Sequence, residues 1–219
     1  MQHPLRLLFA LATVFVFAFC KNTPSDTKVA PPDTKTAAAD TSTFTTPRDT
    51  LVGFKGMERS GYTRPTPGAA EYLYQHYKIR TIDLPNEPGQ AITITQLDSS
   101  LTYSVPSGIK GFFMGIYGNR LFIDIGTGPD VREFLVYDLK AKKALHKAPY
   151  VGDPEVLDNG KLFYLRPAKE EEITKMPDCP DRADWEKNGL GVGYGQVCLY
   201  NLTANTEIRK SEWRCVPMQ

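Results

Sequence analysis

Apolar and polar side chains alternate in short runs from about residue 60 onward, and turn residues separate the runs. The clearest series of such runs begins at Gly111 and ends at residue 150, and it is typical of β-strands separated by turns. Residues rich in glycine, asparagine and lysine interrupt it where tight turns are expected. The pattern predicts a four-stranded antiparallel meander, with strands at residues 112–117, 120–125, 132–139 and 144–150.

The same unit recurs later in the chain. Residues 161–165 (KLFYL) match residues 120–124 (RLFID), which lie 41 positions earlier. Residues 197–202 (VCLYNL) match residues 134–139 (FLVYDL), which lie 63 positions earlier. Because the two offsets differ by 22 residues, we expect an insertion of that size in the last unit.

A fainter copy precedes the clearest unit. Residues 92–97 and 101–105 have the same strand–turn–strand form, and Leu97 lies 42 positions before Leu139. The strand before them is expected at residues 78–84. A period of about 40–50 residues with four strands per unit is the signature of propeller blades.

The tripeptide Tyr137-Asp138-Leu139 and the lysine-rich turn at residues 140–143 follow the third strand of the clearest unit. They resemble the hairpin between the third and fourth strands of bacterial β-propeller repeats. The resemblance implies an all-β fold with about three four-stranded units. A closed propeller needs about four to eight blades, so we expect an open or incomplete arrangement in a monomer. A β-sandwich is the alternative, because alternation alone suits it as well.

Residues 70–77 admit two interpretations. Ala70, Tyr74 and Tyr77 have the spacing of one helix face. Read as a strand, the stretch places Tyr72 and Tyr74 on one face, and the register of the repeat favours this second interpretation.

The first twenty residues have the pattern of an export signal. Arg6 precedes an apolar run at residues 7–19, which is shorter than the roughly 17–25 residues of a membrane-spanning helix. It fits the apolar part of a secretory signal. Cys20 follows the run, with Ala18 two positions before it. This pattern resembles a bacterial lipoprotein signal, which implies removal of residues 1–19 and lipidation of Cys20.

Residues 20–50 are expected to form a lipidated and disordered tether. Residues 21–50 contain nine threonines and four prolines, and Val29 and Phe44 are their only large apolar residues. Such a stretch cannot bury enough apolar surface to offset the cost of ordering the chain. We therefore place the folded domain at residues 51–219. We predict an envelope protein, an outer-membrane lipoprotein that faces the periplasm or the cell surface.

The charge of the chain argues against nucleic acid as a partner. Lys and Arg total 26, Asp and Glu total 25, and the net charge is +1, which gives no general attraction to a polyanion. Loss of residues 1–19 would remove one arginine and leave the chain neutral. The lipid is then the expected membrane attachment. The histidines and cysteines lack zinc-site spacing, and we expect no metal and no cofactor.

Export permits a disulfide among the remaining three cysteines. Cys198 aligns with Leu135, a core position of the third strand, and is expected to be a buried free thiol. Cys179 lies in the insertion and Cys215 lies near the end of the chain, so we expect a disulfide between these two. A bridge between Cys179 and Cys198 is the alternative.

The insertion at residues 168–195 is the candidate binding region. It is polar, rich in proline and glycine, and interrupts a repeat that otherwise continues within a few residues. Long loops in compact domains are commonly functional. Trp185, Tyr194 and Arg182 are the candidate contacts, because such side chains dominate many binding sites. The alternative is that the insertion covers a sheet edge.

Several motifs suggest catalysis or ion binding but lack the context that these functions need. The glycine run at residues 189–195 precedes β-type sequence rather than a helix, which argues against a phosphate loop. There is no Gly-x-Ser-x-Gly elbow, and we interpret His76 and His146 as surface or packing residues. The acidic residues lack the spacing of an EF-hand; those considered are Asp124, Asp130, Asp153, Glu155 and Asp158.

These observations predict a non-catalytic envelope lipoprotein that binds a protein, a glycan or another envelope component through its loops. One alternative is a hydrolase that acts on envelope or imported polymers. The other is a structural subunit of an envelope complex.

The predicted processing can be tested at the mature amino terminus. Mass spectrometry of the chain purified from membranes is expected to show a lipidated Cys20 as the first residue. A mature chain that begins elsewhere and carries no lipid would contradict this assignment.

Overall fold

The structure is a computed structural model that describes residues 53–126, 128–173 and 176–219. The predicted signal and tether lie outside the described residues. The described chain is all-β, as the alternation predicts, and its strands form two antiparallel sheets that are open rather than closed into a ring.

Five strands form the first sheet and seven form the second. The first has the order β1-β2-β3-β4-β5 and comprises β1 (Gly61–Thr66), β2 (Ala69–Leu73), β3 (Tyr77–Asp83), β4 (Gln90–Gln96) and β5 (Thr102–Ser104). The second has the order β12-β11-β10-β9-β8-β7-β6 and comprises β6 (Phe112–Tyr117), β7 (Arg120–Asp124), β8 (Arg132–Asp138), β9 (Lys143–Val156), β10 (Lys161–Pro167), β11 (Gly191–Asn201) and β12 (Thr206–Met218). Two short helices, α1 (Glu170–Ile173) and α2 (Arg182–Lys187), lie between β10 and β11.

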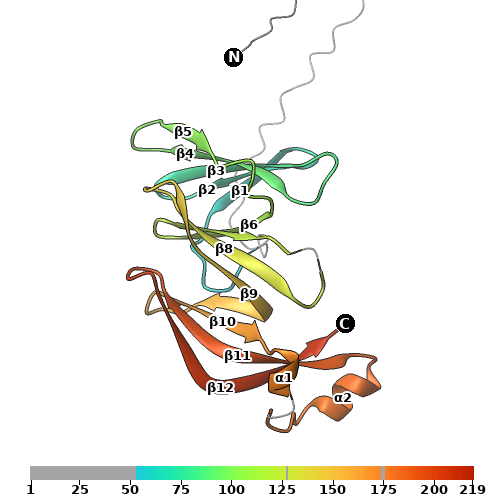
Figure 1. Ribbon diagram of the computed structural model, residues 1–219. Coiled ribbons are helices and arrows are strands. Elements are labelled where there is room, and N and C mark those ends of the chain that lie inside the picture. Colours follow the sequence, from blue (N-terminus) through green and yellow to red (C-terminus); the bar gives the residue numbers. More distant parts are fainter. Residues whose placement is uncertain (1–52, 127, 174–175) are drawn as a thin grey trace, which may run out of the picture. The chain divides into compact units, whose positions relative to one another are not determined.

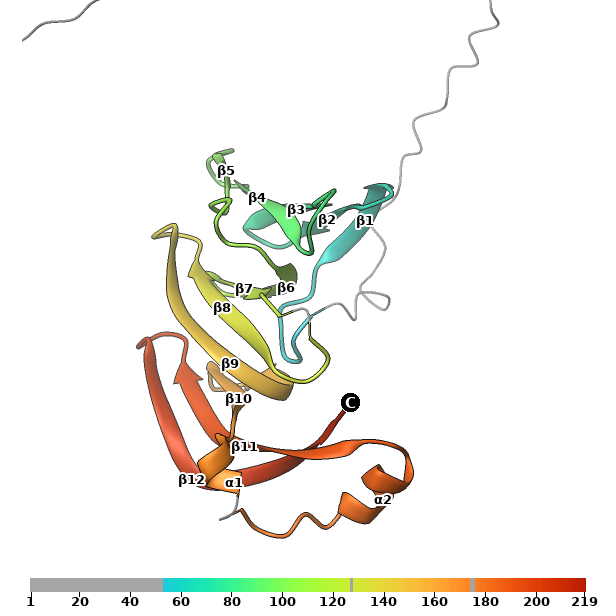
Figure 2. The same cartoon turned by 45° about the vertical axis from the view of Figure 1, so that its right-hand side comes forward.

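Strand β9 divides the second sheet into two four-stranded meanders. Its first half, to residue 150, pairs with β8, and its second half, from residue 151, pairs with β10. Gly152 lies between the halves with a φ of +65°. The strands β6–β9 and β9–β12 are therefore successive units, and Figures 1 and 2 show them with the first sheet as three layers. The prediction of about three open, blade-like units is confirmed.

The same hairpin turn closes all three units. Ser100, Lys142 and Asn205 have positive φ angles of 54°, 52° and 55°, and their spacing repeats the 42- and 63-residue offsets of the sequence. The Oδ1 atom of Asp138 accepts bonds of 2.8 Å from the next two turn amides, at positions 140 and 141. Asn201 does the same in the last unit, at 2.9 and 2.8 Å. The tripeptide at residues 137–139 recurs at residues 200–202 because the side chain of its second residue, Asp138 or Asn201, fixes the turn that follows.

Two apolar cores join the layers. Ile79 and Ile94 of the first sheet pack against Phe113 and Leu121 of the second layer. A second core lies between the second and third layers and includes Phe122, Phe134, Val136, Leu162, Tyr164, Cys198 and Tyr200. Cys198 is a buried free thiol, as predicted. Burial of apolar area between the layers is the main force that holds them together.

Residues 53–60 cover the first strand of the second layer, β6, and the first strand of the third layer, the second half of β9. We call these two strands the inner edges of their layers. The amide of Phe54 donates to the carbonyl of Met114 in β6 at 3.2 Å, and the amide of Glu58 donates to the carbonyl of Ile116 at 2.9 Å. On the other side, the amide of Val156 in β9 donates to the carbonyl of Lys55 at 2.8 Å. Strand β1 then continues the chain along the edge of β2. The sequence did not predict this covering.

Two sequence interpretations are decided by the fold. The helical interpretation of residues 70–77 is wrong, because β2 ends at Leu73 and β3 begins at Tyr77. The insertion predicted at residues 168–195 ends earlier, at residue 190, because residues 191–195 belong to β11. A Cβ at Gly193 would lie 2.6 Å from the sulfur of Met218. Part of the glycine run is thus a strand approached closely by its neighbour.

We expect the crossing of residues 53–60 to depend on Gly56. This residue has a φ of +78°, and a Cβ there would lie 1.9 Å from the carbonyl oxygen of Val156. The substitution Gly56→Ala should lower the free energy of unfolding by about 3 kcal/mol, measured by urea denaturation. The matched control is Gly118→Ala, which also has a positive φ but open space around it, and it should cost only about 1 kcal/mol. Equal effects of the two substitutions would refute the close contact.

Candidate functional site

A concave pocket lies where residues 53–60 cross the inner strands. Its volume is about 510 Å³, and ligand sites usually measure about 300–1,000 Å³. Residues 53–60 form one wall, and the other walls come from β2, β6, β8 and β9. The residues of these strands that line it include Met114, Arg132, Tyr150 and Asp153.

Arg132 is held in this pocket by a buried carboxylate. Asp124 ends β7, its side chain is 0% exposed, and it forms an ion pair with the Nη2 atom of Arg132, whose side chain is 35% exposed. The other oxygen of Asp124 accepts a bond of 3.1 Å from the amide of Gly126. The guanidinium carbon of Arg132 lies 6.0 Å from the centre of the Tyr150 ring. The carboxylate and the ring together fix the direction of the guanidinium.

The position of this ion pair follows from strand register. Arg132 begins β8 and faces Tyr150 across the β8–β9 ladder, while Asp124 faces Phe134 across the β7–β8 ladder. A buried ion pair is rarely a net gain in stability, because both charges lose their water. It does supply a guanidinium of fixed orientation to the pocket.

The rest of the lining mixes charges and apolar groups. Lys55, Arg59 and Arg132 are basic, and Glu58 and Asp153 are acidic. Partly buried Met57 and Met114 add apolar surface, while the tyrosines of the pocket are buried and present little ring face. Among the described lining residues there is no histidine or cysteine. The arrangement can bind a ligand through donors, acceptors and apolar contacts together.

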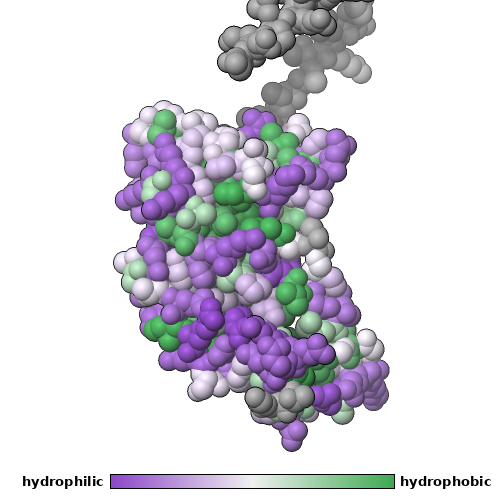
Figure 3. Space-filling model, in the orientation of Figure 1, coloured by the Kyte–Doolittle hydropathy of each residue, from purple (hydrophilic) through white to green (hydrophobic). Residues whose placement is uncertain are grey.

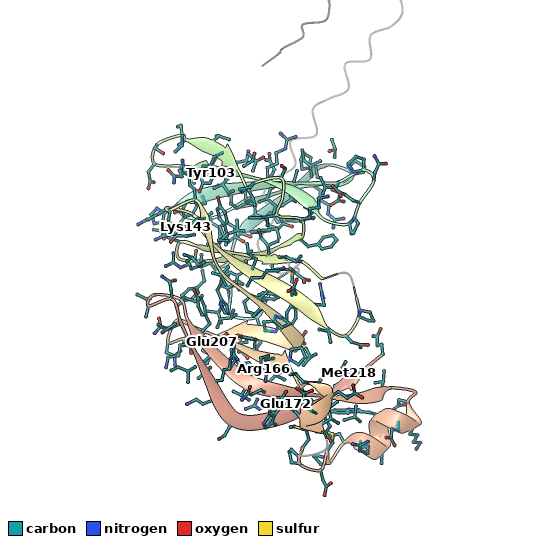
Figure 4. All side chains as sticks on the ribbon, viewed as in Figure 1. Tyr103, Lys143, Arg166, Glu172, Glu207 and Met218 are labelled. Atoms are coloured by element: carbon teal, nitrogen blue, oxygen red, sulfur yellow. A yellow bond between two sulfur atoms is a disulfide. The ribbon has the colours of Figure 1, made fainter. Side chains whose placement is uncertain are left out.

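A second group of titratable side chains is buried between β9, β10, β11 and β12. The Tyr164 hydroxyl donates to the Oε2 atom of Glu207, which lies 3.3 Å from the Nε2 atom of His146. The His146 ring stacks on Tyr200 at 4.1 Å, and Cys198 lies beside Tyr164 in the same core. Figure 4 shows Glu207 on β12, away from Arg166 and Glu172.

The electrostatics of this buried group do not suit nucleophilic catalysis. Burial raises the pKa of the Cys198 thiol, so the thiol stays protonated and is a poor nucleophile. Burial also lowers the pKa of His146, although the Glu207 carboxylate opposes that shift. Burial alone would raise the pKa of Glu207, but hydrogen bonds from Tyr164 and Arg209 outweigh it and the pKa is lowered. The group is a satisfied polar network that joins the last four strands.

A serine, a histidine and an aspartate also gather at a second cavity of about 680 Å³. The Nδ1 atom of His76 lies 3.6 Å from Asp98, and their side chains are 57% and 79% exposed. The Ser99 hydroxyl donates to Gln96 at 3.1 Å rather than to His76. The trio therefore lacks the nucleophile–base bond of a hydrolytic triad.

The insertion places its predicted binding residues in different surroundings. Tyr194 is buried in β11, and its hydroxyl accepts a bond of 3.2 Å from Arg182 in α2. Trp185 lies half-buried on the same helix. The structure thus brings Arg182 and Tyr194 together, and Tyr194 has little surface left for a ligand.

The insertion is tied to the last strand. Cys179 and Cys215 form a disulfide with a Cα–Cα distance of 5.9 Å, between the two cysteines that the sequence favoured. Closing a loop with a sequence separation of 36 stabilises the fold by about 4 kcal/mol in the chain-entropy model. At the start of the insertion, Glu172 accepts a bond of 3.2 Å from Arg166 (Figure 4).

Near the insertion, arginine side chains lie over aromatic rings on both faces of the third layer. The guanidinium of Arg166 lies 5.9 Å from the Trp213 ring, and that of Arg214 lies 5.1 Å from the Phe163 ring. Large exposed apolar side chains of the described chain lie on separate elements, and the view in Figure 3 shows several green areas within a mainly hydrophilic face.

No family model matches the sequence, and no curated protein matches it. The described residues include no helix long and apolar enough to cross a membrane. They also include no group of three or more histidine, cysteine or acidic side chains arranged to hold a metal ion.

Sequence reasoning missed Arg132, and it considered Asp124 only among acidic residues that lack the spacing of a calcium site. A signal was present, because Asp124 is the charged residue between Ile123 and Ile125 at the end of an apolar strand. A carboxylate in such a position needs a buried partner. The partner itself depends on strand register and could not be chosen from the sequence.

We expect the protein to lose stability as the pH falls below about 6.5, the ordinary value for histidine. Because burial lowers the folded-state pKa of His146, the unfolded chain binds more protons between the folded value and 6.5. The contribution of His146 is complete above this window and is lost as the pH falls through it. The contribution of Glu207 is lost at more acidic pH, below its ordinary value of 4.5.

The measurement is the free energy of urea unfolding as a function of pH. The substitution His146→Gln should flatten the dependence in the histidine window. The control His76→Gln removes an exposed histidine and should leave the dependence as in the wild type. A dependence that follows His76 instead would refute the assignment.

Proposed function

We propose that this chain is an exported, non-catalytic binding protein that is anchored to the envelope by lipid on Cys20. Its ligand, an envelope component, binds in the pocket between residues 53–60 and the inner strands. The chain acts as a monomer, since residues 53–60 cover the inner edges of the second and third layers.

One observation carries the proposal for the pocket: Arg132 lines it, is 35% exposed, and is held in place by an ion pair with the fully buried Asp124. Two apolar residues of similar size would hold the strands as well without the cost of desolvating two charges. The presence of a charged pair at this position is explained if the guanidinium of Arg132 binds an acceptor group of a ligand. Arginine with fixed geometry is among the side chains that dominate binding energy.

The proposed address rests on separate features. The apolar run at residues 7–19 ends at Cys20, and a stretch rich in threonine and proline follows it. The Cys179–Cys215 disulfide is in keeping with an oxidising compartment outside the cytosol. A protein on a lipid-anchored tether meets envelope polymers at high local concentration.

The proposal can be tested with Arg132→Lys in the full chain. Lysine keeps a positive charge beside Asp124 but loses the planar guanidinium, so the fold should persist while the affinity for the ligand falls at least about tenfold. Ligands are found by thermal shift against envelope saccharides, lipid headgroups and peptides, and affinities are measured by calorimetry. Light scattering of the same sample should show a monomer.

The matched control is Arg214→Lys, which changes an arginine of β12 outside the pocket and should leave the affinity unchanged. A ligand that binds both variants equally well would refute the pocket as the binding site. Turnover of a bound polymer would refute a non-catalytic role.

A further inference from the structure

The binding pocket is adjacent to the second cavity. Glu58 lines both of them, and the consecutive residues Tyr74 and Gln75 line one each. The volumes are about 510 and 680 Å³. The two cavities therefore offer neighbouring subsites on either side of one side chain.

Glu58 is fixed at this boundary. Its Oε1 atom accepts a bond of 2.5 Å from the amide of Gly118, and its own amide donates to the carbonyl of Ile116 at 2.9 Å. A carboxylate held in this way has lone pairs left to accept hydrogen bonds from hydroxyl groups.

The two subsites differ in polarity. The first combines the sulfur-containing side chains Met57 and Met114 with the guanidinium of Arg132. The second is lined by polar side chains, which include His76, Gln96, Asp98, Asn119 and Lys140. Donors and acceptors are thus present in both, while apolar surface is concentrated in the first.

The charges of the linings nearly balance. Arg132 is neutralised by Asp124, Lys55 lies 3.1 Å from Glu155, and Lys140 shares its cavity with Asp98. A highly charged ligand would meet no excess of opposite charge in these linings. An apolar ligand would bury the polar side chains of the linings without giving them hydrogen-bond partners. A neutral ligand with many hydroxyl groups satisfies both conditions.

We infer that the ligand is a chain of neutral acetamido sugars that passes over Glu58 and occupies both cavities. An acetamido carbonyl accepts from Arg132, and its methyl group packs against Met57 and Met114. Sugar hydroxyls bind Glu58 and the polar side chains of the second cavity. This inference rests on the proposed function of the first cavity and adds the class and length of the ligand.

The test uses the full chain with N-acetylglucosamine and its β-1,4-linked oligomers up to the hexasaccharide. Filling the second cavity should add one or two net hydrogen bonds, so the affinity should rise about tenfold from the monosaccharide to the long oligomers. The substitution His76→Ala with Lys140→Ala should remove most of this gain. The control Lys147→Ala, on the exposed part of β9 outside both linings, should keep it.

The outcomes separate the two proposals. If monosaccharide and oligomers bind equally, the chain-like ligand is refuted and the first pocket stands. If only charged polymers or peptides bind through Arg132, the sugar class is refuted and the proposed binding function stands. If Arg132→Lys changes the affinity for no ligand at all, the proposed function itself fails.

Discussion

Backbone hydrogen bonds between residues 53–58 and the inner strands are the constraint on which the rest of this fold depends. A stack of three units that does not close into a ring leaves the inner edges of its sheets unpaired, and such edges promote aggregation. The amide of Phe54 and the carbonyl of Lys55 bond to β6 and β9 on opposite sides of the segment. The crossing is close enough that Gly53, Gly56 and Gly115 would each carry a Cβ within 3.0 Å of a neighbour. The segment that closes the edges also forms one wall of the candidate pocket.

The first and third layers protect their outer faces in different ways. On the first layer, Thr93 and Thr95 of β4 meet hydroxyl groups of β5 at 3.4 and 3.0 Å, which gives a polar face that water can cover. The third layer carries apolar residues on its outer face, where Arg214 lies over the Phe163 ring, and the insertion covers part of the other face beside Tyr194. Repeat proteins commonly end in modified units for this reason. The disulfide between Cys179 and Cys215 holds the cover in place even though the insertion has few buried apolar side chains.

Much of the fold could be predicted from the sequence because its signals are local. Alternation with a period of two marks strands such as β3 and β4, and short apolar runs mark β7 and β8. The turn chemistry of Asp138 and Asn201 repeats with these strands. Cys198 aligned with Leu135 for the same reason. Residues 53–60 show no alternation of apolar and polar side chains. They bond to β6 and β9, which are distant in sequence, and a local sequence pattern cannot indicate such pairing. The pocket could not be predicted for the same reason. The pairing of Asp124 with Arg132 depends on the register between β7 and β8, which is defined only in the folded sheet.

Two carboxylates of the second sheet pair with basic side chains in different surroundings, and this difference is why we assign the proposed binding function to the pocket. Glu207 is partly buried, receives hydrogen bonds from Tyr164 and Arg209 and faces His146, and Arg209 is 60% exposed. None of these residues lines either cavity. Asp124 is buried more completely, yet its partner Arg132 lines a cavity and remains partly exposed. Both networks incur the cost of burying charge, but Glu207 recovers it through contacts between strands. Asp124 instead holds the side chain of Arg132 at the wall of the cavity, and the proposed binding site rests on this pairing.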